Sequence, residues 1–186
     1  MADNRIRVFD GSLIDPFNPT PDHIRPWNFI HSSSQINRYA GNGRYPYSIG
    51  QHSYNLVQVV PEHLRRAALI HDWGECWFQD MPQPIKVRMP EYRAHEHHAM
   101  VCIGLRFGVS EEEFEELSWW DRQIYIDERN AFVNMTDDIG MGDDRTGLGM
   151  ALHYFREMNW RTVRAMNHAT FNMLFPEHQM EYRYGE

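Results

Sequence analysis

The sequence is poor in lysine and cysteine and contains no long hydrophobic run. Its 186 residues carry a formal net charge of −8, and of its 18 basic residues only Lys86 is a lysine. Long nucleic acids require a basic surface, so we expect no binding of long nucleic acid. No apolar stretch approaches the roughly 20 residues of a membrane span, which argues against a membrane protein.

The two cysteines, Cys76 and Cys102, form neither a CxxC pair nor a disulfide framework. The first residues, MADNRIRVFDG, are polar and lack the apolar segment of a secretory signal. Both observations predict a cytoplasmic protein with reduced thiols.

Breaking and capping residues divide the chain into an arm and a helical domain. Residues 1–26 are rich in Pro, Asp and Asn and predict an irregular arm with a short strand at Ile6–Phe9. Ser48 with Gln51, and Ser110 with Glu113, have the spacing of capping boxes. In residues 27–186 the patterns predict about six helices: 27–39, one after 48, one from 61, 91–107, 111–135 and 161–174. Almost no alternating strand pattern is present, so the fold class is all-α.

Titratable residues follow an apolar stretch in LIHDWGECWFQD. His71 and Asp72 are adjacent, and Glu75 lies four residues after His71, on the same face of a helix. Burying these groups unpaired would cost several kcal/mol, so they are hydrogen-bonded, exposed or bound to a metal. His52 begins a neighbouring predicted helix, and Asp121 follows two tryptophans and also needs a partner.

Imidazole and carboxylate ligands without thiolates suit Zn²⁺, Mn²⁺, Co²⁺ or Fe²⁺. Adjacent residues on a helix point about 100° apart, which separates the side chains of His71 and Asp72. They can share one ion only where the helix ends or is distorted. Gly74 provides a reason for such a break.

The ordered set His52, His71–Asp72 and Asp121 resembles the HD-domain metal-dependent phosphohydrolases. The segments INRYAGNGRYPYSIGQHS, LIHDWGECWFQDMPQPIKVRMPEYR and DRQIYIDERNAFVNM are similar to a phage and bacterial branch of that family. This branch includes 5′-deoxynucleotidases and phage dATP triphosphohydrolases. The similarity extends over residues 27–135 and implies a single HD-domain helical bundle.

The resemblance implies a role for each matching residue. His52, His71, Asp72 and Asp121 would bind a divalent ion such as Zn²⁺, Co²⁺ or Mn²⁺, with a second ion, Mg²⁺, at the phosphates. Asp127 is the alternative to Asp121. Asp121 is preferred because the family has an acid seven residues after this ligand, and Glu128 fills that place.

Further residues are implied around the reacting phosphate. Glu75 would be the catalytic carboxylate acting on water, and Asp80 would support it by stiffening the proline-rich loop or binding a sugar hydroxyl. The expected substrate-binding residues are Arg38 and Lys86 for phosphate, with Tyr39, Gly41 and Pro84 as walls of the base pocket. We interpret His95, His97 and His98 as solvated or interfacial, because they lack HExxH spacing.

The implied activity is hydrolysis of a small deoxynucleotide by a cytoplasmic homo-oligomer, in the host cytoplasm if the chain is phage-encoded. The leading hypothesis is a dNTP triphosphohydrolase acting on dATP, and the alternative is a 5′-deoxynucleotidase acting on dNMPs. Two hypotheses from other classes are a non-catalytic nucleotide-binding HD domain and a helical interaction module whose His and Asp residues are structural.

Overall fold

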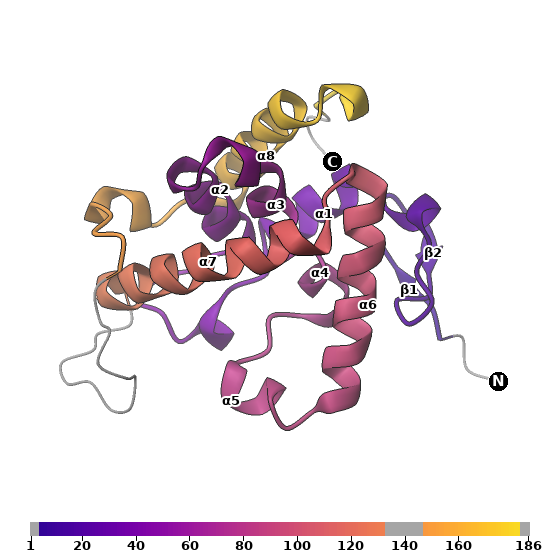
Figure 1. Cartoon of the computed structure of the whole chain (residues 1–186), viewed down its shortest axis with the longest axis horizontal. Helices are drawn as coiled ribbons and strands as arrows, with labels where there is room; N and C mark the ends of the chain where they lie inside the picture. The colour runs from indigo at the N-terminus through magenta and orange to yellow at the C-terminus, as the bar shows by residue number, and fades with distance from the viewer. Residues whose placement is uncertain (1–3, 133–146, 183–186) are drawn as a thin grey trace.

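Helices form nearly all of the regular structure (Figure 1). The computed structural model describes residues 4–132 and 147–182, and this part of the chain contains eight α-helices. They are α1 (Pro26–Ser33), α2 (Ile49–Val59), α3 (Arg65–Ile70), α4 (Glu75–Phe78), α5 (Gln83–Lys86), α6 (Pro90–Phe107), α7 (Glu111–Phe132) and α8 (Trp160–Leu174). The all-α prediction is confirmed. The six predicted helices correspond to α1, α2, α3, α6, α7 and α8, while α4 and α5 are single turns of four residues.

Short 3-10 turns and one hairpin complete the described structure. The 3-10 turns are η1 (Pro21–His23), η2 (Tyr39–Gly41), η3 (Glu62–Leu64), η4 (Leu152–Phe155) and η5 (Pro176–His178). Strands β1 (Ile6–Arg7) and β2 (Leu13–Ile14) pair antiparallel, with Ile6 opposite Ile14. Within the described residues, no helix combines the length and the apolarity needed to cross a membrane.

Capping residues set several helix ends where the sequence predicts them. Ser48 accepts a hydrogen bond from the Gln51 amide at the start of α2 (3.2 Å). Both bonds of the second capping box form at α7, between Ser110 and Glu113 (2.8 and 3.2 Å). Helix α6 ends at Gly108, whose φ of 64° is left-handed.

The first helix is shorter than predicted. It ends at Ser33 rather than at residue 39. The hydroxyls of Ser33 and Ser34 donate to carbonyls within the last turn, a competition with the backbone that weakens helix continuation. Beyond them, Asn37 forms an isolated antiparallel bridge with Ser48. Arg38 therefore lies in an extended connection, not at a helix end as expected.

An aromatic cluster forms the centre of the core. The ring of Trp73 stacks on Phe29 at 4.9 Å with an interplanar angle of 7°, and also contacts Phe107 and Phe171. Burying each such side chain contributes about 1.5–3 kcal/mol. Trp73 directly follows His71 and Asp72, so this packing also fixes the connection between α3 and α4.

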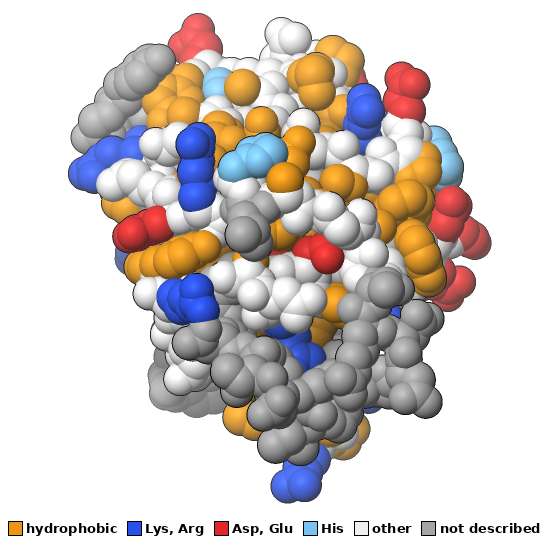
Figure 2. Space-filling view, turned by 90° about the vertical axis from the view of Figure 1, so that its left-hand side faces the viewer, with side chains coloured by type: hydrophobic (Ala, Val, Ile, Leu, Met, Phe, Trp, Pro, Cys, Tyr) orange, Lys and Arg blue, Asp and Glu red, His pale blue; other side chains and the backbone are white. Residues whose placement is uncertain are grey.

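The four tryptophans Trp73, Trp77, Trp119 and Trp120 differ in exposure. Trp73 and Trp77 are buried, whereas Trp119 is 55% exposed and Trp120 is only partly buried. The inward face of α7 instead carries Leu117 and Ile124. On the face at the left of Figure 1, acidic and basic side chains are dispersed among hydrophobic ones (Figure 2).

Candidate metal centre

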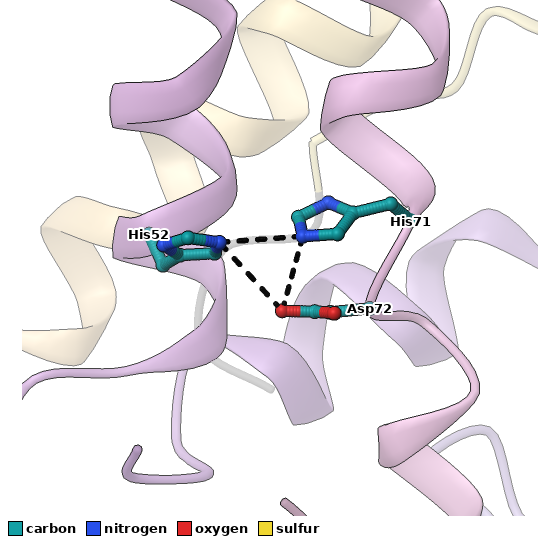
Figure 3. A group of neighbouring side chains, drawn as sticks. All are labelled: His52, His71 and Asp72. Carbon is teal, nitrogen blue, oxygen red and sulfur yellow. Dashed lines mark hydrogen bonds and ion pairs between the residues drawn. The ribbon is translucent and has the colours of Figure 1, made fainter. Parts of the chain in front are cut away.

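Two imidazoles and a carboxylate converge between α2 and the end of α3 (Figure 3). His52 Nε2 lies 3.2 Å from His71 Nε2. Asp72 Oδ2 lies 3.2 Å from His71 Nε2 and 3.8 Å from His52 Nε2. These atoms come from positions up to 20 residues apart in sequence, so the group exists only because α2 packs on α3.

The end of α3 allows adjacent residues to face one point. The helix stops at Ile70, and His71 is its C-cap residue. The backbone then turns until α4 begins at Glu75. His71 Nδ1 donates to the Ala68 carbonyl oxygen at 2.9 Å, so Nε2 is the ring nitrogen directed toward His52 and Asp72. The predicted break in the helix is confirmed.

Asp121 reaches this group from α7, whereas Asp127 does not. Asp121 Oδ1 lies 3.0 Å from His52 Nε2 and 3.8 Å from His71 Nε2. Asp127 instead accepts hydrogen bonds from the backbone amides of Gly149 and Met150. Of the two acids considered from the sequence, Asp121 is the one beside the histidines.

The spacing of these atoms fits a shared ion. Ligands at 2.0–2.2 Å around a tetrahedral Zn²⁺ are separated by roughly 3.3–3.6 Å, and the separations among His52 Nε2, His71 Nε2 and Asp72 Oδ2 range from 3.2 to 3.8 Å. Asp121 Oδ1 lies near both histidines but outside this group, whose three atoms all lie within 4.8 Å of one another. The Asp121 Oδ1 atom is buried, and none of the described residues forms a hydrogen bond with it. Such an oxygen, directed at two imidazole nitrogens, is chemically suited to coordinate a cation.

Charge favours ionised carboxylates in this group. Burial raises the pKa of Asp72, but the charges and hydrogen bonds of His71 and Arg38 outweigh it and lower the pKa. For Asp121, burial is likewise outweighed by His52, so its pKa is lowered. Both acids are therefore present as the anions that bind cations.

Glu128 contacts Nδ1 of His52, the ring nitrogen that does not face His71 and Asp121. Its side chain is fully buried, and Oε1 lies 2.6 Å from His52 Nδ1. Oε1 also accepts from the Tyr47 hydroxyl (2.7 Å), and Oε2 accepts from the Tyr39 hydroxyl (2.8 Å). Burial raises the pKa of Glu128, but His52 and Arg38 lower it overall.

We call the cluster of His52, His71 and Asp72 the candidate metal group, or metal group for short. Arg38 contacts Asp72 of this group, and its side chain is mostly buried. Its Nη1 donates to Asp72 Oδ2 at 2.8 Å, and its Nε lies 3.6 Å from Glu128 Oε2. Burial lowers the pKa of Arg38, but Glu128 and Asp72 raise it further than burial lowers it. The guanidinium remains charged and holds Asp72.

A pocket of about 730 Å³ opens beside the metal group. Its walls come from the α3–α4 connection, α5, α6 and α7. Six carboxylates line it against one lysine and one arginine: Asp72, Glu75, Glu96, Glu111, Glu115 and Asp121, with Lys86 and Arg93. The pocket is thus strongly acidic near the histidines.

Glu75 and Lys86 meet inside this pocket. Glu75 is 7% exposed, and its Oε1 lies 3.6 Å from Lys86 Nζ. Burial, Asp72 and Asp80 together hold the pKa of Glu75 well above its ordinary value. Glu96 accepts a hydrogen bond from Lys86 Nζ at 2.6 Å. The structure therefore brings the two predicted residues together and adds Glu96.

The residues predicted as walls of the base pocket lie outside the lining of this pocket. Asp80 accepts from the Tyr39 amide (3.2 Å) and lines a second cavity of about 780 Å³ beside the β1–β2 hairpin. Tyr39 has a left-handed φ of 60°, and Gly41 follows with a φ of 74°. Tyr39, Gly41 and Pro84 do not line the 730 Å³ pocket.

The remaining histidine cluster lies on α6, outside the metal group. His97 and His98 are exposed, and His97 Nε2 lies 3.5 Å from Glu111. His95 packs edge-on against Phe17 with ring centroids 4.7 Å apart. These positions agree with the interpretation of solvated and interfacial residues.

Roles for Glu96 and Tyr47, and the contact of Glu128 with His52 Nδ1, were not predicted from the sequence. The seven-residue spacing from Asp121 to Glu128 was the available signal, because both then project toward α2 from one face of α7. Nothing in the local pattern marks Glu96, since a charged helix supplies many acids of equal appearance.

No family model matches this chain. Known proteins of similar sequence do exist. The uncharacterized protein YfdR of Escherichia coli is 30% identical over 138 residues, which are 74% of this chain and 74% of YfdR. An uncharacterized protein of Rhodobacter capsulatus is 29% identical over 113 residues, 55% of this chain and 58% of that protein.

Proposed function

We propose that this chain, which belongs to the same family as YfdR of Escherichia coli, is a metal-dependent phosphohydrolase of the HD type acting on small deoxynucleotides. The proposal rests on the resemblance of its ordered motifs and on one structural observation. His52 Nε2, His71 Nε2 and Asp72 Oδ2 converge within 4.8 Å, with Asp121 adjacent. Glu75, a buried carboxylate, is the first residue of α4, three positions after Asp72.

His52, His71, Asp72 and Asp121 would hold the divalent ion. When bound, such an ion polarises phosphoryl oxygens and lowers the pKa of water toward about 7, so that a nucleophile is available at neutral pH. Zn²⁺, Co²⁺ and Mn²⁺ all accept this nitrogen and oxygen donor set.

Glu75 is suited to move the proton. Burial, Asp72 and Asp80 raise the pKa of Glu75 above its ordinary value, which makes its carboxylate a stronger base toward the attacking water. In the proposed reaction, the oxygen of water bonds to phosphorus while the bond from phosphorus to the deoxyribose 5′ oxygen breaks. Glu75 takes the proton of the attacking water and gives it to the departing 5′ oxygen.

Lys86 supplies positive charge on the pocket side. Phosphoryl transfer depends mainly on positioning and on neutralising the charge of the phosphate oxygens. Its ammonium lies 3.6 Å from Glu75, so it can bind a phosphate oxygen next to the proton acceptor.

The first substrate we propose is dATP, with release of deoxyadenosine and triphosphate. A specific observation favours the second candidate, a 5′-deoxynucleotidase. Six carboxylates line the pocket against Lys86 and Arg93, and these carboxylates repel a triphosphate more strongly than a monophosphate. A triphosphate would need further cations, such as the Mg²⁺ expected at the phosphates.

A product assay tests the proposal. Purified protein is incubated with Co²⁺, Mn²⁺ or Zn²⁺ and a panel of dNTPs and dNMPs, and the products are separated by chromatography. Deoxyadenosine and triphosphate from dATP support the triphosphohydrolase, and phosphate released only from dNMPs supports the nucleotidase. Metal binding without hydrolysis of either class would identify a nucleotide-binding HD domain, and absence of metal binding would support a helical interaction module.

A further inference from the structure

Glu128 has no place in the chemistry described above, yet it is among the most completely bonded side chains near the metal group. It lies on α7 with 0% exposure. Its Oε1 contacts His52 Nδ1 at 2.6 Å and the Tyr47 hydroxyl at 2.7 Å, and its Oε2 contacts the Tyr39 hydroxyl at 2.8 Å. A buried carboxylate is costly unless it is hydrogen-bonded and paired, and here three donors and one guanidinium satisfy it.

The contact with His52 determines how that ring faces the ion site. An ionised carboxylate only accepts hydrogen bonds, so His52 Nδ1 must carry the proton in this pair. The other ring nitrogen, Nε2, is the atom that faces His71 and Asp121 at 3.2 and 3.0 Å. Glu128 thus fixes both the rotation of the imidazole and the nitrogen available to a metal.

A second route connects Glu128 to Asp72. Arg38 Nε lies 3.6 Å from Glu128 Oε2, and Arg38 Nη1 donates to Asp72 Oδ2 at 2.8 Å. Asp72 Oδ2 in turn lies 3.8 Å from His52 Nε2. His52, Glu128, Arg38 and Asp72 form a ring of side chains that closes at the place where the ion would bind.

We propose that Glu128 is the positioning residue of the metal centre, orienting His52 directly and Asp72 through Arg38. One buried carboxylate on α7 then sets two ligands, one on α2 and one in the connection between α3 and α4. The inference rests on the metal site of the proposed function, but not on the identity of the substrate.

Metal affinity provides the test, measured for Zn²⁺ and Co²⁺ by competition with a chromophoric chelator. Glu128→Gln keeps the size of the side chain but removes the charge that pairs with Arg38. We expect a loss of affinity of about 10–100-fold, as for other groups that orient metal ligands. Tyr47→Phe is the matched control, because it removes one bond to the same oxygen of Glu128 without touching a ligand. It should change the affinity less than about threefold.

A spectroscopic measurement separates positioning from general stability. In the Co²⁺-loaded protein, the exchangeable ring protons of His52 and His71 give strongly shifted proton resonances. Glu128→Gln should move the resonance of the His52 Nδ1 proton and leave that of His71, whose Nδ1 donates to Ala68. If Glu128→Gln does not fold, Glu128→Asp keeps the charge but shortens the side chain, and the same loss of affinity is expected.

Wild-type affinity in folded Glu128→Gln or Glu128→Asp would overturn the inference. An equal loss in Tyr47→Phe would also overturn it, since the effect would then follow stability. A wild-type protein that binds the ion and hydrolyses no nucleotide would contradict the proposed function alone, because the comparison of affinities would still hold.

Discussion

Lys86 Nζ donates to Glu96 Oε1 across 2.6 Å, and this pair joins α5 to α6 at the wall of the acidic pocket. The same ammonium lies 3.6 Å from Glu75. Burial lowers the pKa of Lys86, but Glu96 and Glu75 raise it overall. The only lysine of the chain is therefore held charged beside the proposed proton acceptor.

This pair predicts an unusually unreactive lysine. Amine-specific acylation can modify only Lys86 and the terminal amine, and peptide mapping distinguishes the two. We expect Glu96→Gln to accelerate acylation of Lys86, by about tenfold for each unit by which its pKa falls. A deoxynucleotide with the metal ion should slow acylation in the wild type. Equal rates in the wild type and in Glu96→Gln would show that the pair does not restrain Lys86.

Glu75 should affect turnover without affecting metal binding. Because its carboxylate stands outside the group formed by His52, His71 and Asp72, Glu75→Gln should keep the wild-type metal content. Loss of a general acid–base group should lower kcat by about 10²–10⁴-fold. Glu111→Gln, an exposed acid on the wall of the same pocket, is the control and should retain most activity. Undiminished turnover in Glu75→Gln would remove Glu75 from the mechanism.

The two aspartates of α7 should differ in their effect on the metal. Asp121→Asn should lower the affinity for Zn²⁺ or Mn²⁺ at least about tenfold, since Asp121 Oδ1 faces both imidazoles. Asp127→Asn should weaken only the contact with Gly149 and Met150. Metal content after dialysis, measured by atomic emission, compares the variants directly. The reverse order of effects would make Asp127 the ligand.

Stability should depend on the protonation of His168, which packs edge-on against Trp27 and Tyr182. Burial lowers its pKa from the ordinary 6.5, against a smaller raising effect of the Met180 carbonyl. The unfolded chain then binds the proton more readily, so the free energy of unfolding should fall as the pH drops below about 6.5.

Denaturant unfolding between pH 7.5 and 5.5 measures this dependence. The slope with pH should become shallower in His168→Gln and remain that of the wild type in His98→Gln, where an exposed histidine is replaced. Contributions of other groups cancel in the comparison of variants. An unchanged slope in His168→Gln would show that His168 titrates alike in both states.

Local signals predicted the helices, and the resemblance to HD-domain phosphohydrolases predicted the residues of the metal group. The capping boxes at Ser48 and Ser110 act within four residues, so the sequence alone contains the relevant geometry. The break after Ile70 was likewise foreseeable from Gly74 and from the need for His71 and Asp72 to face one point.

Long-range pairing could not be predicted in the same way. Arg38 was expected at a helix end, but the bridge of Asn37 to Ser48 draws it into an extended segment beside Asp72. Its contact with phosphate stays a prediction. The bonds of Glu128 join residues 76 to 89 positions apart. Such contacts depend on how α7 packs against α2, which no local pattern specifies.

We propose that one divalent ion, held by His52, His71, Asp72 and Asp121, is required for hydrolysis of a deoxynucleotide. The most direct test is to remove metal with a chelator, add back Mn²⁺ or Co²⁺ in steps, and follow product release from dATP and dAMP against bound metal. We expect no hydrolysis without metal and a linear rise that levels off near one ion per chain. Hydrolysis that is indifferent to chelation, or no hydrolysis of either nucleotide by fully loaded protein, would contradict it.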